Sequence, residues 1–495
     1  MKKILLFCLA CIMTVTVCFA SSCKKNPSGN GGNDYGVDLS GVTYNDATGE
    51  MYVGTKEGKT RIKVAEHLGG YGLGWLLACG KQFLLEEENA NYYLVLEGDT
   101  SLTSSLTAKL ESGRNLADVY FSLATSWQNW AAQSYLANLD DLFTATIPGE
   151  DVTVESKMSD AWKTYSKSIC EGETHSFSFP WTENITGIVY NETMFNQYGW
   201  QVPTTVSELL TLCETIVKDT NGKVSPFVYP GANGGYFDFL GTTWWLQIAG
   251  VEGMQQYMNF ADYEVYNPDK ALGEAKLAAL ETFTSVFGPK VNAKYSLKGS
   301  NSKTAVLAQM SFANGEAAMI PNGNWMENES ADVLAENEIS IKMMRTPYAN
   351  DAMKDANGEY KKVGYGATAD FAIVPAEASN VEGGKRFLLY LCKDEYLKLI
   401  TETSGAVRPF TYDVSGCNTS DFLKSCLDIW ATSENWFDCS ESILYAAGKA
   451  KKFLTDNPYM KIVYDEYDAE TFVYKEYSAA RTNWDSYLEE VGLKK

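Results

Sequence analysis

One stretch of the sequence joins a turn to a short apolar strand: Phe179-Pro180-Trp181-Thr182-Glu183-Asn184-Ile185-Thr186-Gly187-Ile188-Val189-Tyr190-Asn191. Proline and the polar residues near it favour a turn at the start. Residues 187–190 have the length and apolar character of a buried strand. Further on, Thr205 and Glu208 have the Thr-x-x-Glu spacing of a capping box, which predicts that a helix begins there. A strand leading into helices is typical of an α/β protein.

Short apolar segments recur outward from this stretch and alternate with helical patterns. Residues 61–66 place Ile62 and Val64 on one face of a strand, and Leu76, Cys79 and Phe83 then follow at helical spacing. Further strands are expected at 92–96, 118–123, 317–320 and 371–374, and further helices at 208–217, 274–287, 385–397 and within 444–493. This alternation favours an α/β fold with mostly parallel sheets.

The N-terminus has the pattern of an export signal. Lys2 and Lys3 precede the apolar residues 4–19, a stretch shorter than the roughly 20 apolar residues of a membrane-spanning helix. Residues 20–23, Ala-Ser-Ser-Cys, resemble a lipobox, which predicts a lipoprotein signal peptide at 1–22 and lipidation of Cys23. Cleavage after Ala20 by an ordinary signal peptidase is the alternative.

Residues 24–34 contain no apolar side chain that a core could bury, which is typical of a flexible segment. We therefore expect a tether and N-terminal extension at 23–59. About 430 residues follow the tether, more than one hydrophobic core usually holds, so two domains are expected.

Composition limits the classes of partner. The net charge is −22, or −24 without Lys2 and Lys3, and no basic stripe is visible, so a nucleic-acid partner is not expected. The 30 tyrosines and 12 tryptophans suit neutral ligands with apolar faces and many hydroxyls, such as pyranose rings. The seven cysteines after Cys23 form no CxxC pair, so we expect no metal site and no cofactor, although Cys417, Cys426 and Cys439 leave room for one disulfide.

Catalytic motifs are sparse. The chain has no G-x-S-x-G nucleophile elbow, no G-x-x-x-x-G-K-[ST] phosphate loop and only two histidines. A glycoside hydrolase needs two carboxylates across a cleft, and 63 acidic residues offer such pairs by chance without singling one out. We therefore expect no enzyme activity, and a secreted glycoside hydrolase is an alternative.

Several motifs together resemble the bacterial extracellular solute-binding proteins, the sugar-binding receptors of ABC importers such as the maltose-binding proteins. The most specific is Phe312-Ala313-Asn314-Gly315-Glu316-Ala317-Ala318-Met319-Ile320-Pro321-Asn322-Gly323-Asn324-Trp325, which has the family's Ala-Met pair and Gly-x-Trp. The other motifs, in the family's order, are 61–72, 118–142, 179–191, 385–388 and 404–409. A longer segment before residue 60 and a longer C-terminal tail depart from the family pattern.

The resemblance implies a periplasmic-binding-protein-like fold of type II, with two discontinuous α/β lobes joined by a hinge. Lobe 1 is expected at 60–182 and 364–407 and lobe 2 at 183–363 and 408–495, with crossings near Pro180, Tyr365 and Arg408. It also implies capture of a mono- or oligosaccharide and delivery to the permease of an ABC importer. The expected location is the extracellular face of the cell membrane, or the periplasm in a cell with an outer membrane, with the lipidated N-terminus in the bilayer.

In such folds ligands bind where loops leave the carboxyl ends of strands. The resemblance implies that Trp325 stacks on a sugar ring, with packing between the lobes as the alternative role. The full set of expected ligand contacts is His67, Tyr71, Trp127, Trp181, Glu183, Tyr236, Trp244, Asn322, Asn324, Trp325 and Asp370. A SusD-like glycan-capturing surface lipoprotein, built mostly from helical repeats, is a further alternative.

Overall fold

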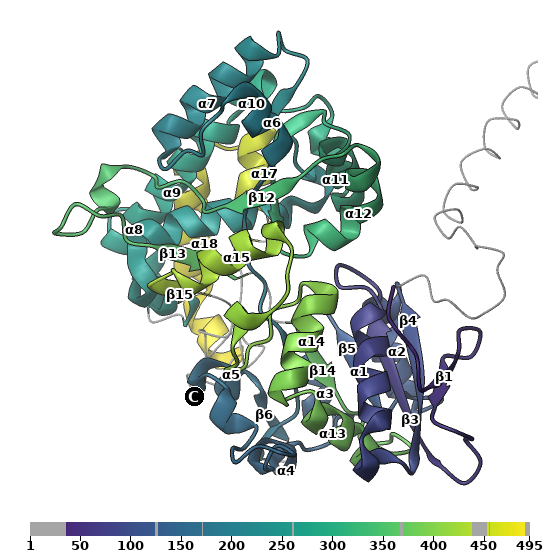
Figure 1. Cartoon of the computed structure of the whole chain (residues 1–495). Helices are drawn as coiled ribbons and strands as arrows, with labels where there is room; N and C mark the ends of the chain where they lie inside the picture. Colours follow the sequence, from purple (N-terminus) through teal and green to yellow (C-terminus); the bar gives the residue numbers. More distant parts are fainter. Residues whose placement is uncertain are drawn as a thin grey trace, which may run out of the picture.

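The computed structural model describes residues 36–123, 127–170, 172–259, 262–366, 370–437, 453–454 and 456–490. The predicted signal peptide at 1–22, the predicted lipidation site Cys23 and the cysteine Cys439 lie outside these residues. The chain folds into two units, one above the other in Figure 1, each built around its own sheet. The expected two-lobed α/β fold is therefore confirmed.

The first unit contains a seven-stranded sheet in the order β1-β2-β4-β3-β5-β14-β8. Its strands are β1 (Thr43–Asn45), β2 (Glu50–Tyr52), β3 (Thr60–His67), β4 (Tyr92–Asp99), β5 (Val119–Ser122), β8 (Phe179–Thr182) and β14 (Asp370–Ile373). Only β3 pairs in parallel, with β4 and β5. The expectation of mostly parallel sheets is wrong, because β14 returns from the second unit and runs against β5 and β8.

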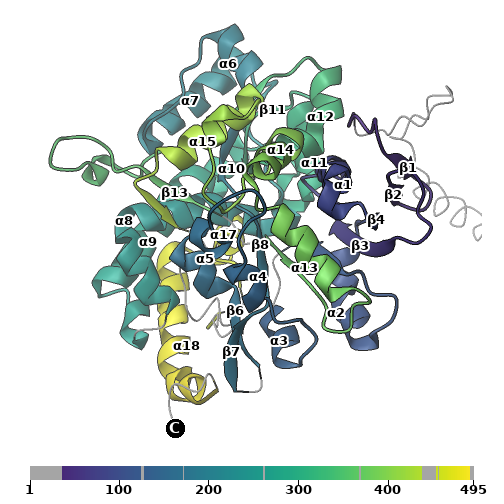
Figure 2. The ribbon, with the colours of Figure 1, turned by 60° about the horizontal axis from the view of Figure 1, so that its bottom comes forward.

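The N-terminal extension contributes to this sheet. Sequence analysis assigned no strand to residues 23–59, yet β1 and β2 form a hairpin there and β2 pairs with β4. Met51 in β2 is fully buried, so this part of the extension belongs to the core of the first unit. Figure 2 shows the hairpin at the outer edge of the sheet.

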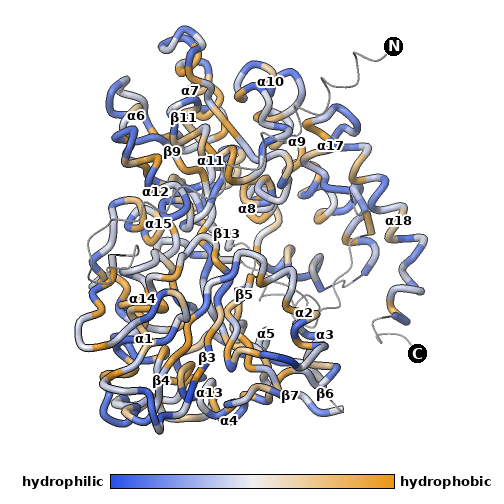
Figure 3. Tube along the Cα trace, turned by 90° about the vertical axis from the view of Figure 1, so that its right-hand side faces the viewer, coloured by the Kyte–Doolittle hydropathy of each residue, from blue (hydrophilic) through white to orange (hydrophobic). Residues whose placement is uncertain are grey.

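Helices cover the sheet of the first unit. They are α1 (Gly74–Leu85), α2 (Leu102–Ser112), α3 (Trp127–Ala132), α4 (Asp140–Thr144), α5 (Asp160–Tyr165), α13 (Val381–Tyr390) and α14 (Asp394–Ser404), with the hairpin β6 (Lys167–Cys170) and β7 (Glu173–Ser176) beside them. Ile62 and Val64 are fully buried, as their alternation predicts. Hydrophobic residues are concentrated along β3, β4 and β5 (Figure 3).

The helix predicted at 385–397 is in fact two helices. The break falls between the end of α13 and Lys393, whose backbone is extended where α14 begins. Asp394 and Glu395 then occupy the first turn of α14, where their charges complement the helix dipole. The hydrophobic spacing alone did not reveal this break.

The second unit has a four-stranded sheet in the order β10-β11-β9-β12. Its strands are β9 (Thr186–Asn191), β10 (Ser225–Phe227), β11 (Ala317–Gly323) and β12 (Ile341–Met344), and β13 (Val363–Tyr365) pairs separately with β15 (Asn435–Phe437). Its helices are α6 (Glu192–Tyr198), α7 (Val206–Asp219), α8 (Asp238–Met258), α9 (Ala271–Phe287), α10 (Pro289–Tyr295), α11 (Ala305–Ala313), α12 (Met326–Glu336), α15 (Asp421–Ala431), α17 (Pro458–Val463) and α18 (Ala469–Glu490).

The capping box predicted at the start of α7 is present. The backbone N–H of Glu208 donates to the Thr205 hydroxyl at 3.2 Å, and the Glu208 carboxylate accepts from the backbone N–H of Thr205 at 3.1 Å. Two helix N–H groups that would otherwise lack partners are thereby satisfied. Among the described residues, no helix combines the length and hydrophobicity that crossing a membrane requires.

Three crossing segments lie side by side between the units. Glu183 forms an antiparallel bridge with Val407, and Ile185 forms one with Gly366. Phe410 still packs in the core of the first unit, whereas α15 packs against β12 of the second. The division into lobes at 60–182, 364–407, 183–363 and 408–495 stays a proposal, with the last boundary moved from 408 to between Phe410 and α15.

Candidate ligand-binding site

A cavity of about 620 Å³ lies between the two units. The first unit lines it with the loop after β3, the end of β5, β8 and the start of β14. The second unit lines it with residues 233–239 and with the residues that follow β11. The lining side chains that carry polar or aromatic groups are Glu66, His67, Tyr71, Phe121, Ser122, Trp181, Asn184, Asn233, Tyr236, Asp238, Phe239, Trp325, Glu329, Tyr365 and Asp370.

Trp325 forms one wall of the cavity, immediately after β11. Its ring meets Tyr236 and Phe239 edge-on, with centroids 6.4 and 5.7 Å apart. Two glycines make room for it: a Cβ on Gly70 would lie 2.4 Å from the Trp325 Cβ, and a Cβ on Gly323 would lie 2.1 Å from its ring. Since Gly70 follows β3 of the first unit, Trp325 touches both units.

Trp181 lines the cavity from β8 of the first unit and is almost fully buried. Its ring centroid is 4.1 Å from that of Trp75 and 4.9 Å from that of Phe121, and the Arg408 guanidinium lies 4.7 Å from it. These neighbours hold the ring in place by packing and by a cation–π contact. They also cover much of its surface, so Trp325 offers the more accessible aromatic face.

A hydrogen-bonded network crosses the floor of the cavity. The Tyr71 hydroxyl donates to the Asn184 carbonyl oxygen at 2.8 Å, and the Asn184 amide donates to the Asp370 carboxylate at 3.3 Å. The Thr182 hydroxyl donates to the same carboxylate oxygen at 3.2 Å. Burial, together with the Asp370 charge, raises the pKa of Tyr71 well above its usual value, so the phenol keeps its proton and serves as the donor.

Other ionisable groups at the cavity have shifted pKa values. Burial raises the pKa of the Glu66 carboxyl well above its usual value, and desolvation also raises that of Glu329. Burial raises the pKa of Tyr236 to about 12. Desolvation lowers the pKa of His67, whose Nδ1 lies 3.2 Å from the Thr103 hydroxyl, so the imidazole is neutral near pH 7.

Six of the predicted ligand contacts meet at this cavity: His67, Tyr71, Trp181, Tyr236, Trp325 and Asp370. The structure places the other five, Trp127, Glu183, Trp244, Asn322 and Asn324, outside its lining. Trp127 and Trp244 are fully buried in the cores of the two units, where the Trp244 indole donates to the Pro347 carbonyl at 2.9 Å. Trp244 therefore lies in the core of the second unit and does not face the cleft, as had been expected from the sequence.

The three polar residues among these five belong to the hinge and its surroundings. Asn324 accepts from the backbone N–H of Ile185 at 3.0 Å and donates to the Gly405 carbonyl at 3.1 Å, so its amide ties crossing segments together. Glu183 accepts from the Trp162 indole at 3.2 Å. Asn322 is fully buried and accepts from the backbone N–H of Gly323. These groups are used within the protein rather than turned to the cavity.

Sequence analysis missed nine of the polar or aromatic lining residues, among them Glu66, Asn184, Asp238, Phe239 and Glu329. Glu66 and Asn184 had a detectable signal, since Glu66 ends a predicted strand and Asn184 lies in the crossing stretch. The other three lie on or beside α8 and α12, and their positions depend on how these helices pack. Among the described residues, no cluster of histidine, cysteine and acidic side chains has the grouping of a metal site.

The sequence model of the bacterial extracellular solute-binding protein family matches residues 83–398. The chain belongs to this family. Over 151 residues this solute-binding protein is 29% identical to the multiple sugar-binding protein of Streptococcus mutans. That match covers 30% of this chain and 33% of the relative, so it spans about a third of the relative's length.

Solved structures share the fold of this solute-binding protein. The apo form of RafE from Streptococcus pneumoniae superposes with a TM-score of 0.59 at 15% identity, covering 86% of this chain and 98% of that one. A structure described in connection with xylan utilization by Caldanaerobius polysaccharolyticus gives 0.62 at 16% identity, covering 85% and 99%. At these identities the likeness establishes the two-lobed fold alone.

Proposed function

We propose that this chain is an extracellular receptor that captures a mono- or oligosaccharide between its lobes and delivers it to the permease of an ABC importer. The observation that carries the proposal is the cavity between the units, where aromatic rings lie beside carboxylates and amides. Aromatic faces stack on the C–H faces of pyranose rings, and carboxylates accept charge-assisted hydrogen bonds from hydroxyls. Two structural neighbours support the same ligand class: RafE has been solved with raffinose, and another with stachyose.

The proposed mechanism is closure of the two lobes around the sugar, without covalent chemistry. The contact between Gly70 and Trp325 lies where the first unit meets the second, and three neighbouring crossings provide the hinge. A sugar held by both walls would stabilise the closed arrangement, which the permease would then recognise. The SusD-like alternative fits poorly, because that class is mostly helical and this chain contains a seven-stranded and a four-stranded sheet.

A glycan library screened by thermal shift tests the proposal. We expect at least one mono- or oligosaccharide to raise the melting temperature, because a ligand at 100 times its dissociation constant stabilises a protein by about 2.7 kcal/mol. Calorimetry on the best ligand should give one site per chain, and chromatography should recover the sugar unchanged. Absence of binding across the library contradicts a sugar receptor, and steady hydrolysis of the sugar supports the glycoside hydrolase instead.

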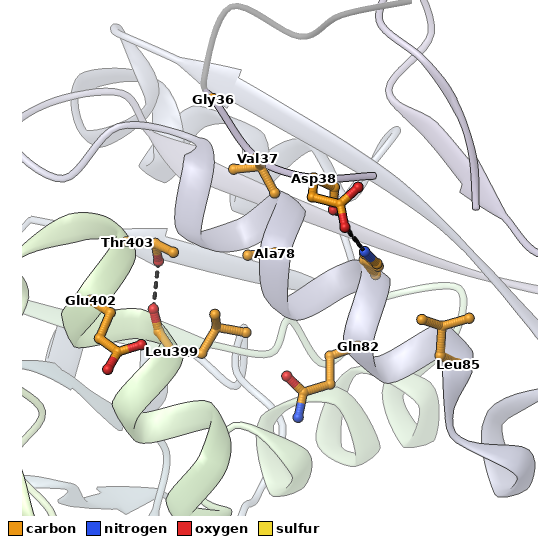
Figure 4. A pocket seen from close by; sticks show the side chains of 10 residues that line it. Gly36, Val37, Asp38, Ala78, Gln82, Leu85, Leu399, Glu402 and Thr403 are labelled. Atoms are coloured by element: carbon orange, nitrogen blue, oxygen red, sulfur yellow. Dashed lines mark hydrogen bonds and ion pairs between the residues drawn. The ribbon is translucent and has the colours of Figure 1, made fainter. Parts of the chain in front are cut away.

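The N-terminal segment supports a tether attached to the first unit. Figure 4 shows residues 36–38 lying along α1 beside a shallow hollow between α1 and α14. The Lys81 ammonium pairs with the Asp38 carboxylate at 2.9 Å and also donates to the Asp38 carbonyl, which fastens the segment to α1. We propose that the protein is anchored to the membrane by a lipid on Cys23.

Replacing Cys23 with alanine is expected to release the protein from the membrane fraction. The thioether that carries the lipid needs the cysteine sulfur, and without acyl chains nothing in the proposed tether binds a bilayer. The measurement is the distribution of the protein between membrane and medium, with Cys79→Ala as a control, because that thiol is fully buried in α1. Unchanged membrane retention of the Cys23 variant contradicts lipidation at this site.

A further inference from the structure

Gly70 lies in the loop after β3, at a point where the first unit touches the second. A Cβ added to Gly70 would lie 2.4 Å from the Trp325 Cβ, 3.1 Å from its Cγ and 3.4 Å from its Cδ1. Trp325 follows β11 of the second unit, yet its side chain packs against the hydrophobic core of the first. The two units therefore meet here without space for any side chain at position 70.

The backbone conformation of Gly70 does not require glycine. Its φ lies outside the left-handed range that other residues rarely adopt, whereas Gly72 in the same loop has a φ of +63°. Backbone conformation therefore accounts for the glycine at position 72, and the approach of Trp325 accounts for the one at position 70. An alanine at position 70 would suit the backbone of its own unit and meet Trp325 of the other.

The loop that contains Gly70 is held on both sides. Leu68 before it fills the space that Gly98 leaves, since a Cβ on Gly98 would lie 2.6 Å from the Leu68 Cγ. Tyr71 after it is buried, and its hydroxyl donates to the Asn184 carbonyl oxygen at 2.8 Å. A side chain added at position 70 would therefore find little relief in a local movement of the loop.

Trp325 is held as firmly from its own side. Its ring lies against Gly323, where an added Cβ would be 2.1 Å away. Asn324 next to it accepts from the backbone N–H of Ile185 at 3.0 Å and donates to the Gly405 carbonyl at 3.1 Å. Rotation of the ring does not relieve a collision at the Trp325 Cβ, because the backbone fixes that atom. Close-packed contacts of this kind transmit strain, so the movement that remains is separation of the two units.

We propose that Gly70 is a positioning residue for closure of the receptor, because a residue without a side chain at this contact lets the two units come together around the sugar. The inference rests on the proposed sugar-binding function and adds a residue that sets affinity through the closed arrangement. A side chain at this position acts as a wedge that lowers the population of closed protein, and the apparent affinity falls in proportion to that population. Since the wedge acts on the protein, every sugar should lose affinity by the same factor.

Gly70→Ala and Gly70→Leu test the wedge by calorimetric titration with raffinose, stachyose and every other sugar that the library screen detects. We expect Gly70→Ala to bind each sugar at least about tenfold more weakly, because overpacking a tight contact is costly, and Gly70→Leu to lose more. The ratio of the affinities for any two sugars should stay that of the parent.

Gly416→Ala is the matched control for the added methyl group. Gly416 lies outside the cavity lining, and its φ is also outside the left-handed range. The new Cβ would meet the ends of the Asp413 and Lys398 side chains, which can move. The affinity of this variant for each sugar should equal that of the parent.

Small-angle X-ray scattering without sugar gives a readout that does not depend on binding. The parent should show the arrangement of the structure, in which the two units touch at Gly70 and Trp325. Gly70→Leu should have a larger radius of gyration, because the wedge holds the units apart. Its circular dichroism spectrum should match that of the parent, since each unit keeps its own fold.

The outcomes separate this inference from the proposed function. Unchanged sugar affinities in Gly70→Leu, or scattering that matches the parent, overturn the wedge and leave the sugar receptor standing. A loss confined to some of the sugars shows that position 70 acts by contact with the ligand, which also overturns the wedge. Failure of every sugar in the library overturns the receptor and the role of Gly70 in sugar capture, and the scattering identifies that case because the expansion of Gly70→Leu remains.

Discussion

The variant Trp325→Ala is expected to bind its sugar roughly 30- to 1,000-fold more weakly, a loss of about 2–4 kcal/mol typical of an aromatic anchor at a binding site. Trp325 offers an accessible aromatic face to the cavity, and Gly70 and Gly323 leave the space that its side chain occupies. Because its partners Tyr236 and Phe239 also line the cavity, fold stability should fall much less than affinity. Calorimetric titration gives the affinity, and differential scanning calorimetry gives the stability of the same variant.

A core tryptophan provides the matched control for this prediction. Trp244→Ala removes a fully buried ring whose indole N–H has a protein partner, so it should cost about 3–5 kcal/mol of folding stability. The folded fraction of that variant should keep its affinity for the sugar. A large loss of melting temperature in Trp325→Ala, with affinity retained, would remove Trp325 from the ligand site and leave it a contact between the lobes.

Local patterns predicted the fold well because burial and capping act over a few residues. The alternation around Ile62 and Val64 gave the central strand, and the spacing of Thr205 and Glu208 gave the start of α7. The direction of a strand could not be predicted from local patterns. β14 lies antiparallel to β5 because the chain returns from the other unit, and no local sequence pattern indicates that return. The hairpin that contains Met51 was not predicted for a similar reason. Its strands have only three residues each and are stabilised by the pairing of β2 with β4, which is distant in sequence.

The site was predictable where a residue follows a strand and carries a large ring. Trp325 follows β11 and satisfies both conditions, whereas Trp181 lines the cavity from within β8. Two adjacent residues can have different roles, and the sequence does not show which one faces the ligand. The Asn324 side chain forms hydrogen bonds to the crossing segments, whereas Trp325 next to it faces the cavity. The buried Glu66 could not be ranked above 62 other acidic residues from the sequence, because its burial beside the cavity depends on how distant segments pack around β3.

The variant Lys276→Met is expected to lose about 3–5 kcal/mol of folding stability at neutral pH, the usual cost of removing one member of a buried ion pair. The Lys276 ammonium pairs with the Glu476 carboxylate, which joins α9 to the C-terminal α18, and both residues are buried. The ammonium also lies over the rings of Trp245 and Tyr257, at 4.8 and 4.6 Å from their centroids. Urea unfolding of the variant and the parent measures the difference.

A second substitution separates the ion pair from simple packing. The double variant Lys276→Met with Glu476→Leu should recover most of the loss, because no unpaired charge remains buried. Lys424→Met, which breaks an exposed pair with Asp421, should cost no more than about 1 kcal/mol. A deficit in Lys276→Met that is equal in the double variant would show that the lysine stem, rather than its charge, holds α18 against α9.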